Sequence, residues 1–496
     1  MMLRPMFTAA LLLSSGLVVP AYAEELTLAV SANVTTLDPR QSSTVQTNLS
    51  VASHLYTPLV IRQPDLSIAP AAAESWEAVD DTTWHFTLRQ GITFSDGTVL
   101  DADLVKWNIE SMLDPDDPKH NAPWFKSISA VTVLGPYELE IKTSEPYPAL
   151  LDQMSMFFLM SPEWTKSHDP SKEAMGSGPY ELVSYTSGDS VVLKAREDYY
   201  GGKPEFDDVT IRSIPESAAR VAGLMAGELD LIFDIPPTEI ARINDSGKGK
   251  AGAVSSVRSM FLKINTLKEP FGDKKLRQAL NYALDKEGML DALFDGHGEV
   301  SRCQVLSPAY FGYNETLEPY PFDPDKARAL IAETGIATPI PVELEVPVGR
   351  YLLASEIAQV AEMELEDVGF DVTIKEMSFS SYIDKYIRAH DLGQLSYLGQ
   401  AWPTLDADGL LALFEMGSVY AYWDDQEFKD LLDKARATVD KTKRKALYAD
   451  ATAHMCEEAP AAFLFNQPVV YAMSDRIDWT VRGDDWVRAQ DITLKK

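Results

Sequence analysis

Residues 176–233 constrain the fold of this chain more than any other stretch. Gly and Pro punctuate the start, and two strand-like runs then flank a turn at residues 187–190. An aromatic corner, an alternating run and an amphipathic pattern follow in order, at residues 199–204, 209–214 and 217–227. This order predicts a hairpin, a third strand and a helix that ends at Gly227, which are parts of an α/β domain.

The first 23 residues have the pattern of a secretory signal. Arg4 precedes an apolar run from Met6 to Val19, and Ala21-Tyr22-Ala23 is a small-x-small cleavage site. The alternative is a membrane-spanning helix, but the run is too short for about 30 Å of hydrocarbon. No cysteine follows the cleavage site, which argues against a lipid anchor. We therefore predict a cleaved signal peptide and export to the periplasm.

Charge and motif content exclude several function classes. With 44 basic and 75 acidic residues the net charge is −31, which disfavours nucleic acid and anionic membranes as partners. No His or Cys spacing supports a metal site, and no nucleophile elbow or phosphate loop occurs. Asp406 and Asp408 could serve as a hydrolytic carboxylate pair, but such pairs arise by chance in so acidic a chain. We predict no catalytic residue, no metal and no cofactor.

The mature chain contains two cysteines, Cys303 and Cys456. In an oxidising compartment they could form a disulfide. We favour the alternative, two buried thiols that never meet, because the sequence does not place their Cα atoms at bonding distance.

The element pattern changes after residue 265. Before it, short alternating runs dominate, including hairpins around residues 84–94 and 131–141 and a helix from Asp101 to Met112. After it, helical periodicity alternates with short strands, which argues for an α/β domain. The expected helices cover residues 273–285, 323–333, 355–368 and 426–439, and the expected strands 342–346, 372–376 and 395–400.

Several segments together resemble one protein family. They are Gly-Ser-Gly-Pro-Tyr at 176–180, Tyr-Tyr-Gly-Gly-Lys-Pro at 199–204, Ala-Gly-Glu-Leu-Asp at 226–230 and the helical run at 277–285. In this order they resemble extracytoplasmic solute-binding proteins of family 5, the peptide and nickel binders of ABC importers. The resemblance implies an α/β, two-lobed periplasmic binding protein fold, type II-like with an extra domain, whose lobes a two-strand hinge joins.

The same resemblance implies a division of the chain. After the signal peptide at 1–23, domain I would comprise residues 24–57, 176–265 and 469–496. The extra domain II would cover 58–175, and domain III 266–468. Ligand would be held between domains I and III, and closure would bury it.

Residues 398–409 match the family segment that lines the ligand cleft. Trp402 would supply a flat apolar wall with an N–H donor, and a carboxylate beside it suits a cationic group. The alternative is that Trp402 is core and the aspartates cap a helix. The dipeptide binders place their ammonium-binding Asp where this chain has Leu405, so Asp406 takes that role or the group is not held.

Other positions follow from the resemblance as well. Arg350 lies where dipeptide binders hold the ligand carboxylate, and its planar fork suits bidentate binding; a solvated loop Arg is the alternative. The remaining candidate ligand contacts are Tyr397, Gln400, Ser43, Thr44, Val45, Asn121 and Trp124.

The predicted function is capture of a peptide or peptide-like solute, such as an opine or another amino-acid conjugate, for an ABC importer. The partners would be the ligand and the permease subunits in the inner membrane, and the protein would be a monomer. One alternative is a nickel chelate, sugar conjugate or other non-peptide ligand. The other is an exported hydrolase that uses Asp406 and Asp408.

Overall fold

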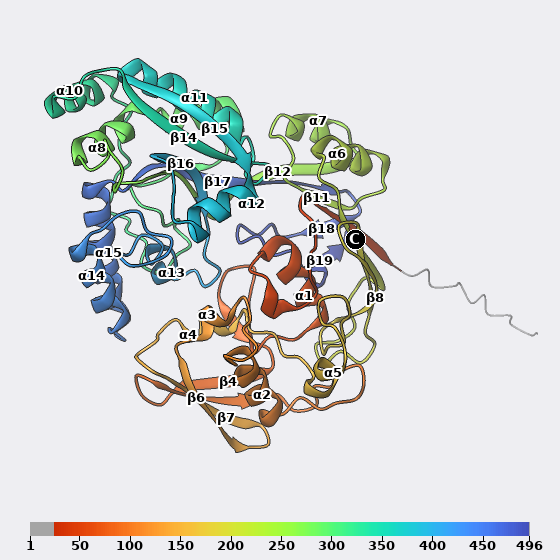
Figure 1. Ribbon diagram of the computed structural model, residues 1–496. Coiled ribbons are helices and arrows are strands. Elements are labelled where there is room, and N and C mark those ends of the chain that lie inside the picture. The colour runs from red at the N-terminus through yellow and green to blue at the C-terminus, as the bar shows by residue number, and fades with distance from the viewer. Residues whose placement is uncertain (1–23, 496) are drawn as a thin grey trace, which may run out of the picture.

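One large mixed sheet runs through the molecule. The computed structural model describes residues 24–495, so the predicted signal peptide lies outside the described residues. The sheet has eleven strands in the order β15-β14-β16-β12-β17-β11-β1-β10-β9-β8, with β13 paired to β17. Two clusters of helices and a separate small sheet surround it (Figure 1). The mixed α/β class is as predicted.

The N-terminal lobe is one half of this sheet with its helices. Strands β1 and β11 run parallel, β10 is parallel to β1, and β8 and β9 complete the hairpin predicted around residue 188. Helix α6 ends at Gly227, which adopts the left-handed conformation that stops a helix. The elements are β1 (Glu25–Val30), α1 (Ser50–Leu55), β8 (Tyr180–Thr186), β9 (Ser190–Ala195), β10 (Asp208–Ser213), α6 (Ser217–Ala226), β11 (Leu231–Phe233) and α7 (Glu239–Asp245).

The C-terminal lobe is the other half. Strand β14 pairs in parallel with β15 and β16. Helices begin where predicted, because aspartates cap them: Asp273 accepts a hydrogen bond from the Lys275 N–H, and Asp323 from the Lys326 N–H. The elements are α8 (Lys274–Ala283), α9 (Lys286–Phe294), α10 (Pro324–Thr334), β14 (Ile340–Val348), α11 (Ala354–Val368), β15 (Phe370–Ser378), α12 (Phe379–Ile383), β16 (Leu395–Gln400), α13 (Ala407–Leu411), α14 (Gln426–Arg436) and α15 (Lys441–Glu458).

Two long strands join the lobes. Strands β12 (Gly249–Ile264) and β17 (Ala461–Ser474) pair antiparallel and belong to both halves of the sheet; the short β13 (Glu299–Val300) lies against β17. Their register shifts between Ser255 and Ser259. Since the ladder is interrupted only at this bulge and at a second one next to it, the strands can bend there. This is the two-strand hinge that the resemblance implied.

A four-stranded unit lies below the large sheet in Figure 1. Its strand order is β4-β5-β7-β6, and Asp101 caps α2 by accepting from the Leu104 N–H. The elements are β2 (Val60–Arg62), β3 (Ile68–Pro70), β4 (Ala73–Ala78), β5 (Thr83–Leu88), α2 (Ala102–Met112), α3 (Ala122–Phe125), β6 (Ile128–Gly135), β7 (Glu138–Thr143), α4 (Leu150–Met154) and α5 (Pro162–Ser167). The expected hairpin around residues 84–94 is wrong: β5 pairs with β4 and β7, whereas Thr93 forms only an isolated bridge with Val99.

Each of these three parts has its own apolar core. The clusters draw on residues 257–465, on residues 59–159, and on residues 26–56 together with 156–233 and 469–492. Trp124 packs against two of them, so the parts touch. The cores agree with a three-domain division, whose boundaries stay a prediction.

The C-terminal tail returns to the N-terminal lobe and carries β18 (Ile477–Trp479) and β19 (Ile492–Leu494). Short irregular helical turns cover Pro39–Gln41, Val45–Leu49, Asp384–Arg388 and Ala489–Asp491. Within residues 24–495 no helix is both long and apolar enough to cross a bilayer.

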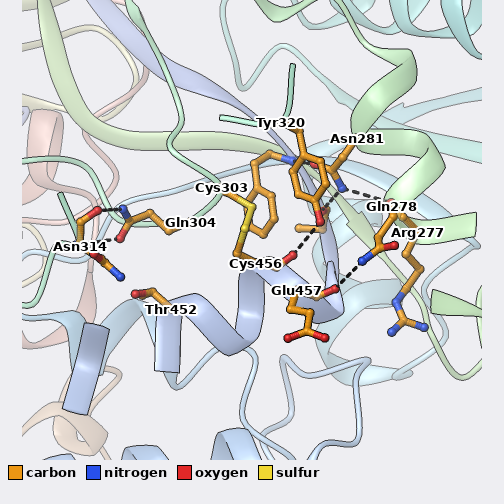
Figure 2. The surroundings of a disulfide bond; sticks show 12 residues. Arg277, Gln278, Asn281, Cys303, Gln304, Asn314, Tyr320, Thr452, Cys456 and Glu457 are labelled. Atoms are coloured by element: carbon orange, nitrogen blue, oxygen red, sulfur yellow. Dashed lines mark hydrogen bonds between the residues drawn. A yellow bond between two sulfur atoms is a disulfide. The ribbon is translucent and has the colours of Figure 1, made fainter. Parts of the chain in front are cut away.

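A disulfide settles the open question about the two cysteines. Cys303 and Cys456 are bonded, with their Cα atoms 5.2 Å apart and a sequence separation of 153. Figure 2 shows the bond where α15 meets the loop after β13, and the Tyr320 hydroxyl donates to the Cys456 carbonyl at 2.8 Å. The bond joins two segments of the C-terminal lobe that are distant in sequence.

Candidate functional site

The strand ends of both lobes converge on the hinge. Phe233, the last residue of β11, pairs with Tyr471, and the strand points along β17 toward the bulge. From the other side Gln400, the last residue of β16, pairs with Ser259 at the same bulge. Ligands of open α/β sheets bind outside the carboxyl ends of strands. The crevice above the hinge is therefore the candidate site.

Arg350 enters this crevice from the C-terminal lobe. It follows β14, and Leu352 two residues later packs against an apolar cluster of the N-terminal lobe. The exposed guanidinium lies 5.3 Å from the Tyr351 ring centre and 5.5 Å from that of Phe379. Within residues 24–495 no carboxylate lies within 4.0 Å of it. The surrounding protein desolvates Arg350 and lowers its pKa, and the Arg258 charge adds to this effect.

Trp402 is held from several sides. Its backbone N–H donates to the Tyr310 hydroxyl at 2.6 Å, and its ring packs edge-on against Trp124 with the centres 6.0 Å apart. Gly409 lies so close that a Cβ there would be 2.0 Å from the Trp402 ring. Since Trp124 comes from α3, this contact joins the four-stranded unit to the C-terminal lobe. The ring is only partly buried.

Asp406 and Asp408 already have basic partners. Arg444 donates to both Asp406 oxygens at 2.7 Å, and this pair is buried. Arg436 donates to Asp408 at 2.5 Å. Burial raises the pKa of Asp406 and opposes the charge of Arg444, while each partner favours the charged form of the other. Asp406 also accepts the Asp408 N–H at 3.0 Å, the helix-capping alternative.

Tyr397 and Gln400 lie on β16 next to these groups. The Tyr397 ring packs edge-on against Tyr351, with the ring centres 5.8 Å apart, which places it beside Arg350. Its hydroxyl is buried without a hydrogen-bond partner in the described chain, and burial raises its pKa well above the usual value. Gln400 is partly buried at the strand end. Both positions suit donors to a ligand.

The candidates from the N-terminal half divide into two groups. Asn121 donates to the carbonyls of Pro39 and Ser42, both at 2.8 Å, and so anchors the segment before residues 43–45. Ser43 and Thr44 are exposed, and Val45 packs on the core. Among the described residues, no hydrogen bond or ring contact joins residues 43–45 to Arg350 or Trp402.

The sequence analysis missed a group of charged residues at the crevice. Arg258 lies within the bulge between Ser255 and Ser259 and pairs with Asp485 at 2.7 Å, although the two are 227 positions apart in sequence. Arg62 donates to the Thr404 carbonyl and to Asp152, both at 2.8 Å, and so ties the four-stranded unit to the C-terminal lobe. The many charged residues at 482–488 were the one signal in the sequence that could have indicated this group. Their partners, such as Arg258, are distant in sequence and come near only in the folded chain. Within residues 24–495 no three His, Cys, Asp or Glu side chains cluster as metal ligands.

Comparison with known proteins adds an independent finding. A family model described as bacterial extracellular solute-binding proteins, family 5 Middle, matches residues 67–436. The chain is 29% identical to the dipeptide-binding protein of Escherichia coli (strain K12) over 439 residues, which is 81% of each protein. It is 26% identical to the glutathione-binding protein GsiB of Salmonella paratyphi A, over 95% of this chain and 94% of that one.

Among solved structures, the chain resembles the PBP AgaA from A.tumefacien R10 in complex with agropinic acid. The TM-score is 0.82 at 25% identity, over 95% of this chain and 99% of that one.

Proposed function

The chain belongs to the bacterial extracellular solute-binding proteins of family 5, and on that premise we propose that it captures a peptide or peptide-like solute in the crevice above the hinge. An opine or another amino-acid conjugate is included in this class. The protein then delivers the solute to the membrane subunits of an ABC importer. Relatives that bind dipeptides and glutathione, and a similar structure that holds agropinic acid, support this class of ligand.

The observation that carries the proposal is the unpaired Arg350 where the strand ends converge. Its planar fork matches a carboxylate, and peptides, opines and glutathione all contain one. In a crevice that excludes water, such a pair gains strength that it lacks in bulk solvent. Although Arg350 is exposed, the protein around it desolvates the guanidinium and disfavours the free cation, so an incoming carboxylate would relieve this cost.

Aromatic side chains would form the walls of the site. Trp402 and Trp124 present one partly buried edge-on pair, and Tyr397 offers a hydroxyl without a partner. We propose that these groups enclose the solute's side chain and backbone, while Gln400 donates from the end of β16.

The roles of Asp406 and Asp408 differ from the one that the resemblance implied. Because Arg444 and Arg436 saturate them, we propose that they position the Trp402 segment and leave ligand charge to other residues. A hydrolytic role would require one free carboxylate, so these ion pairs favour binding over hydrolysis.

Delivery would depend on closure about the hinge. The bulge between Ser255 and Ser259 lets β12 and β17 bend, and the ligand would shift the population toward the closed arrangement. We further propose that residues 1–23 are removed on export and that the monomer works in the periplasm without a lipid anchor.

Thermal unfolding with a small ligand panel tests the proposal. The panel is Ala-Phe, glutathione, agropinic acid, a nickel–histidine chelate and a bile acid. A ligand at a hundredfold its Kd adds about 2.7 kcal/mol and must raise Tm. Ala-Phe, glutathione or agropinic acid should do so. If only the chelate or the bile acid raises Tm, the peptide-like class is wrong. Mass spectrometry should recover the bound solute intact; cleaved product would instead indicate a hydrolase.

A further inference from the structure

Asp234 occupies a special position in the N-terminal lobe. It directly follows β11, at the strand end that points to the hinge crevice, and Ser31 directly follows the parallel neighbour β1. The Ser31 hydroxyl donates to Asp234 Oδ2 at 2.5 Å. The carboxyl ends of two parallel strands thus bring a carboxylate and a hydroxyl together at the crevice.

The backbone at Asp234 is held in an uncommon conformation. Its φ is 53°, in the left-handed region that non-glycine residues rarely occupy. The buried Arg220 braces it by donating to the carbonyls of Phe233 at 2.9 Å and Asp234 at 2.7 Å. Two more Arg220 bonds reach the carbonyls of Ile214 and Pro215. Such a fixed conformation with dedicated support is typical of functional positions.

Unlike the two aspartates near Trp402, Asp234 has no basic partner. Within residues 24–495 no Lys, Arg or His nitrogen lies within 4.0 Å of its carboxylate. Arg220 spends its donors on carbonyl oxygens and not on this side chain. Asp234 is partly buried and carries an oxygen that Ser31 does not engage. The carboxylate is therefore available to a cation that enters from the crevice.

Arg350 and Asp234 come from opposite lobes and lie in the same region of the fold. Leu352, two residues after Arg350, packs against the cluster that contains Ile232 and Ile235, on either side of Asp234. Desolvation and the Arg258 charge lower the pKa of Arg350, and the charges of Asp485 and Asp234 act in the opposite direction. The two groups are thus close enough to interact but do not form an ion pair. Opposite charges on opposite lobes, with no direct contact, form a pair of anchors for one molecule.

We propose that Asp234 is a specificity-determining residue that binds the ammonium group of a zwitterionic solute whose carboxylate binds Arg350. The inference rests on the proposed function and narrows its ligand class to solutes with both charges. It also explains how a ligand stabilises closure: each lobe contributes one charge, and the solute joins them.

Calorimetric titration with three probes tests this assignment. The probes are the dipeptide Ala-Phe, N-acetyl-Ala-Phe, which lacks the ammonium group, and Ala-Phe amide, which lacks the carboxylate. Wild-type protein should bind Ala-Phe about tenfold to a hundredfold more tightly than the acetylated probe, the range for a hydrogen bond to a charged group. In Asp234→Asn this ratio should fall to about one, while affinity for the acetylated probe stays unchanged.

Asp245→Asn is the matched control, since Asp245 is an exposed aspartate at the end of α7. It should keep the wild-type ratio. The unchanged affinity of Asp234→Asn for N-acetyl-Ala-Phe guards against misfolding as the cause of any loss. If Asp234→Asn keeps the wild-type ratio of affinities for Ala-Phe and N-acetyl-Ala-Phe, the inference is wrong. The same holds if Asp406→Asn abolishes this ratio instead. Either result leaves the proposed function intact. If wild-type protein binds none of Ala-Phe, glutathione and agropinic acid, the proposed function fails and this inference with it.

Discussion

Two groups of charged side chains near the hinge differ in whether they form ion pairs within the protein. Asp406 and Asp408 lie beside Trp402, and each is paired with an arginine of its own lobe. Asp234 and Arg350 lie on opposite lobes, and neither has an ion-pair partner within residues 24–495. In the first group ion pairs engage the carboxylates, and we propose that they hold a segment in place; in the second we propose that the unpaired charges bind a ligand. Residue type and motif position do not separate the two cases; the partners do.

The largest expected effect is in the first group. Arg444→Met leaves Asp406 buried and unpaired, which should cost about 3–5 kcal/mol in the free energy of unfolding. Urea unfolding of the C-terminal lobe measures it. Lys445→Met, at an exposed neighbour, is the control and should cost little. A loss in ligand affinity with unchanged stability would assign Asp406 to the ligand and break the comparison.

Removal of the disulfide should also affect stability more than binding. The bond closes a loop of 153 residues, so Cys303→Ala combined with Cys456→Ala should lower the free energy of unfolding by about 2–5 kcal/mol. Ligand affinity at 25 °C should stay within a few-fold of wild type, because none of the residues labelled around the bond in Figure 2 is a candidate ligand contact. Chemical reduction of the wild-type protein should reproduce the loss. Equal stability of oxidised and reduced protein would contradict this.

Acid should destabilise the N-terminal lobe through the buried His54. His54 is fully buried: Nδ1 donates to the Ser50 carbonyl at 2.7 Å, and Nε2 accepts the Ala489 N–H at 2.9 Å. Burial lowers the pKa of His54 from 6.5 to about 4. The unfolded chain therefore binds a proton at a higher pH than the folded chain, and this contribution is complete above about pH 6.5. About 3 kcal/mol should be lost as pH falls from 6.5 to 4.

Urea unfolding across this pH range, in wild type and His54→Asn, isolates the contribution. The slope should become smaller in His54→Asn and stay unchanged in His120→Asn, which replaces an exposed histidine. Identical slopes in all three proteins would show that His54 does not control acid stability.

Replacement of Arg350 should have the smallest effect on free energy, but its result is the most informative. Arg350→Gln should weaken binding of Ala-Phe by about tenfold to a hundredfold. The urea midpoint should remain at its wild-type value, since no ion pair within residues 24–495 depends on Arg350. Arg388→Gln, at an exposed arginine, should change neither quantity. A loss of stability without a loss of affinity would mean that Arg350 has a structural role, like Asp406 and Asp408.

Much of the fold followed from local pattern. Aspartate caps set the starts of α2, α8 and α10, Gly227 ended α6, and alternation located β14, β15 and β16, because these signals act within a few residues. The hairpin predicted around residues 84–94 is wrong because β4, which directly precedes β5, and the more distant β7 occupy both edges of β5.

Residues 176–233 identified the family from sequence alone, and motif position pointed to Arg350 and Trp402. Sequence could not say that Asp406 is paired with Arg444, which is 38 residues away, nor that Leu352 packs against the cluster that contains Ile232 and Ile235. Nor could it decide whether Cys303 and Cys456 meet. Local signals determine elements and family, because capping and alternation need only near neighbours. Which charges remain free for a ligand depends on contacts between distant segments, and only the tertiary structure decides those.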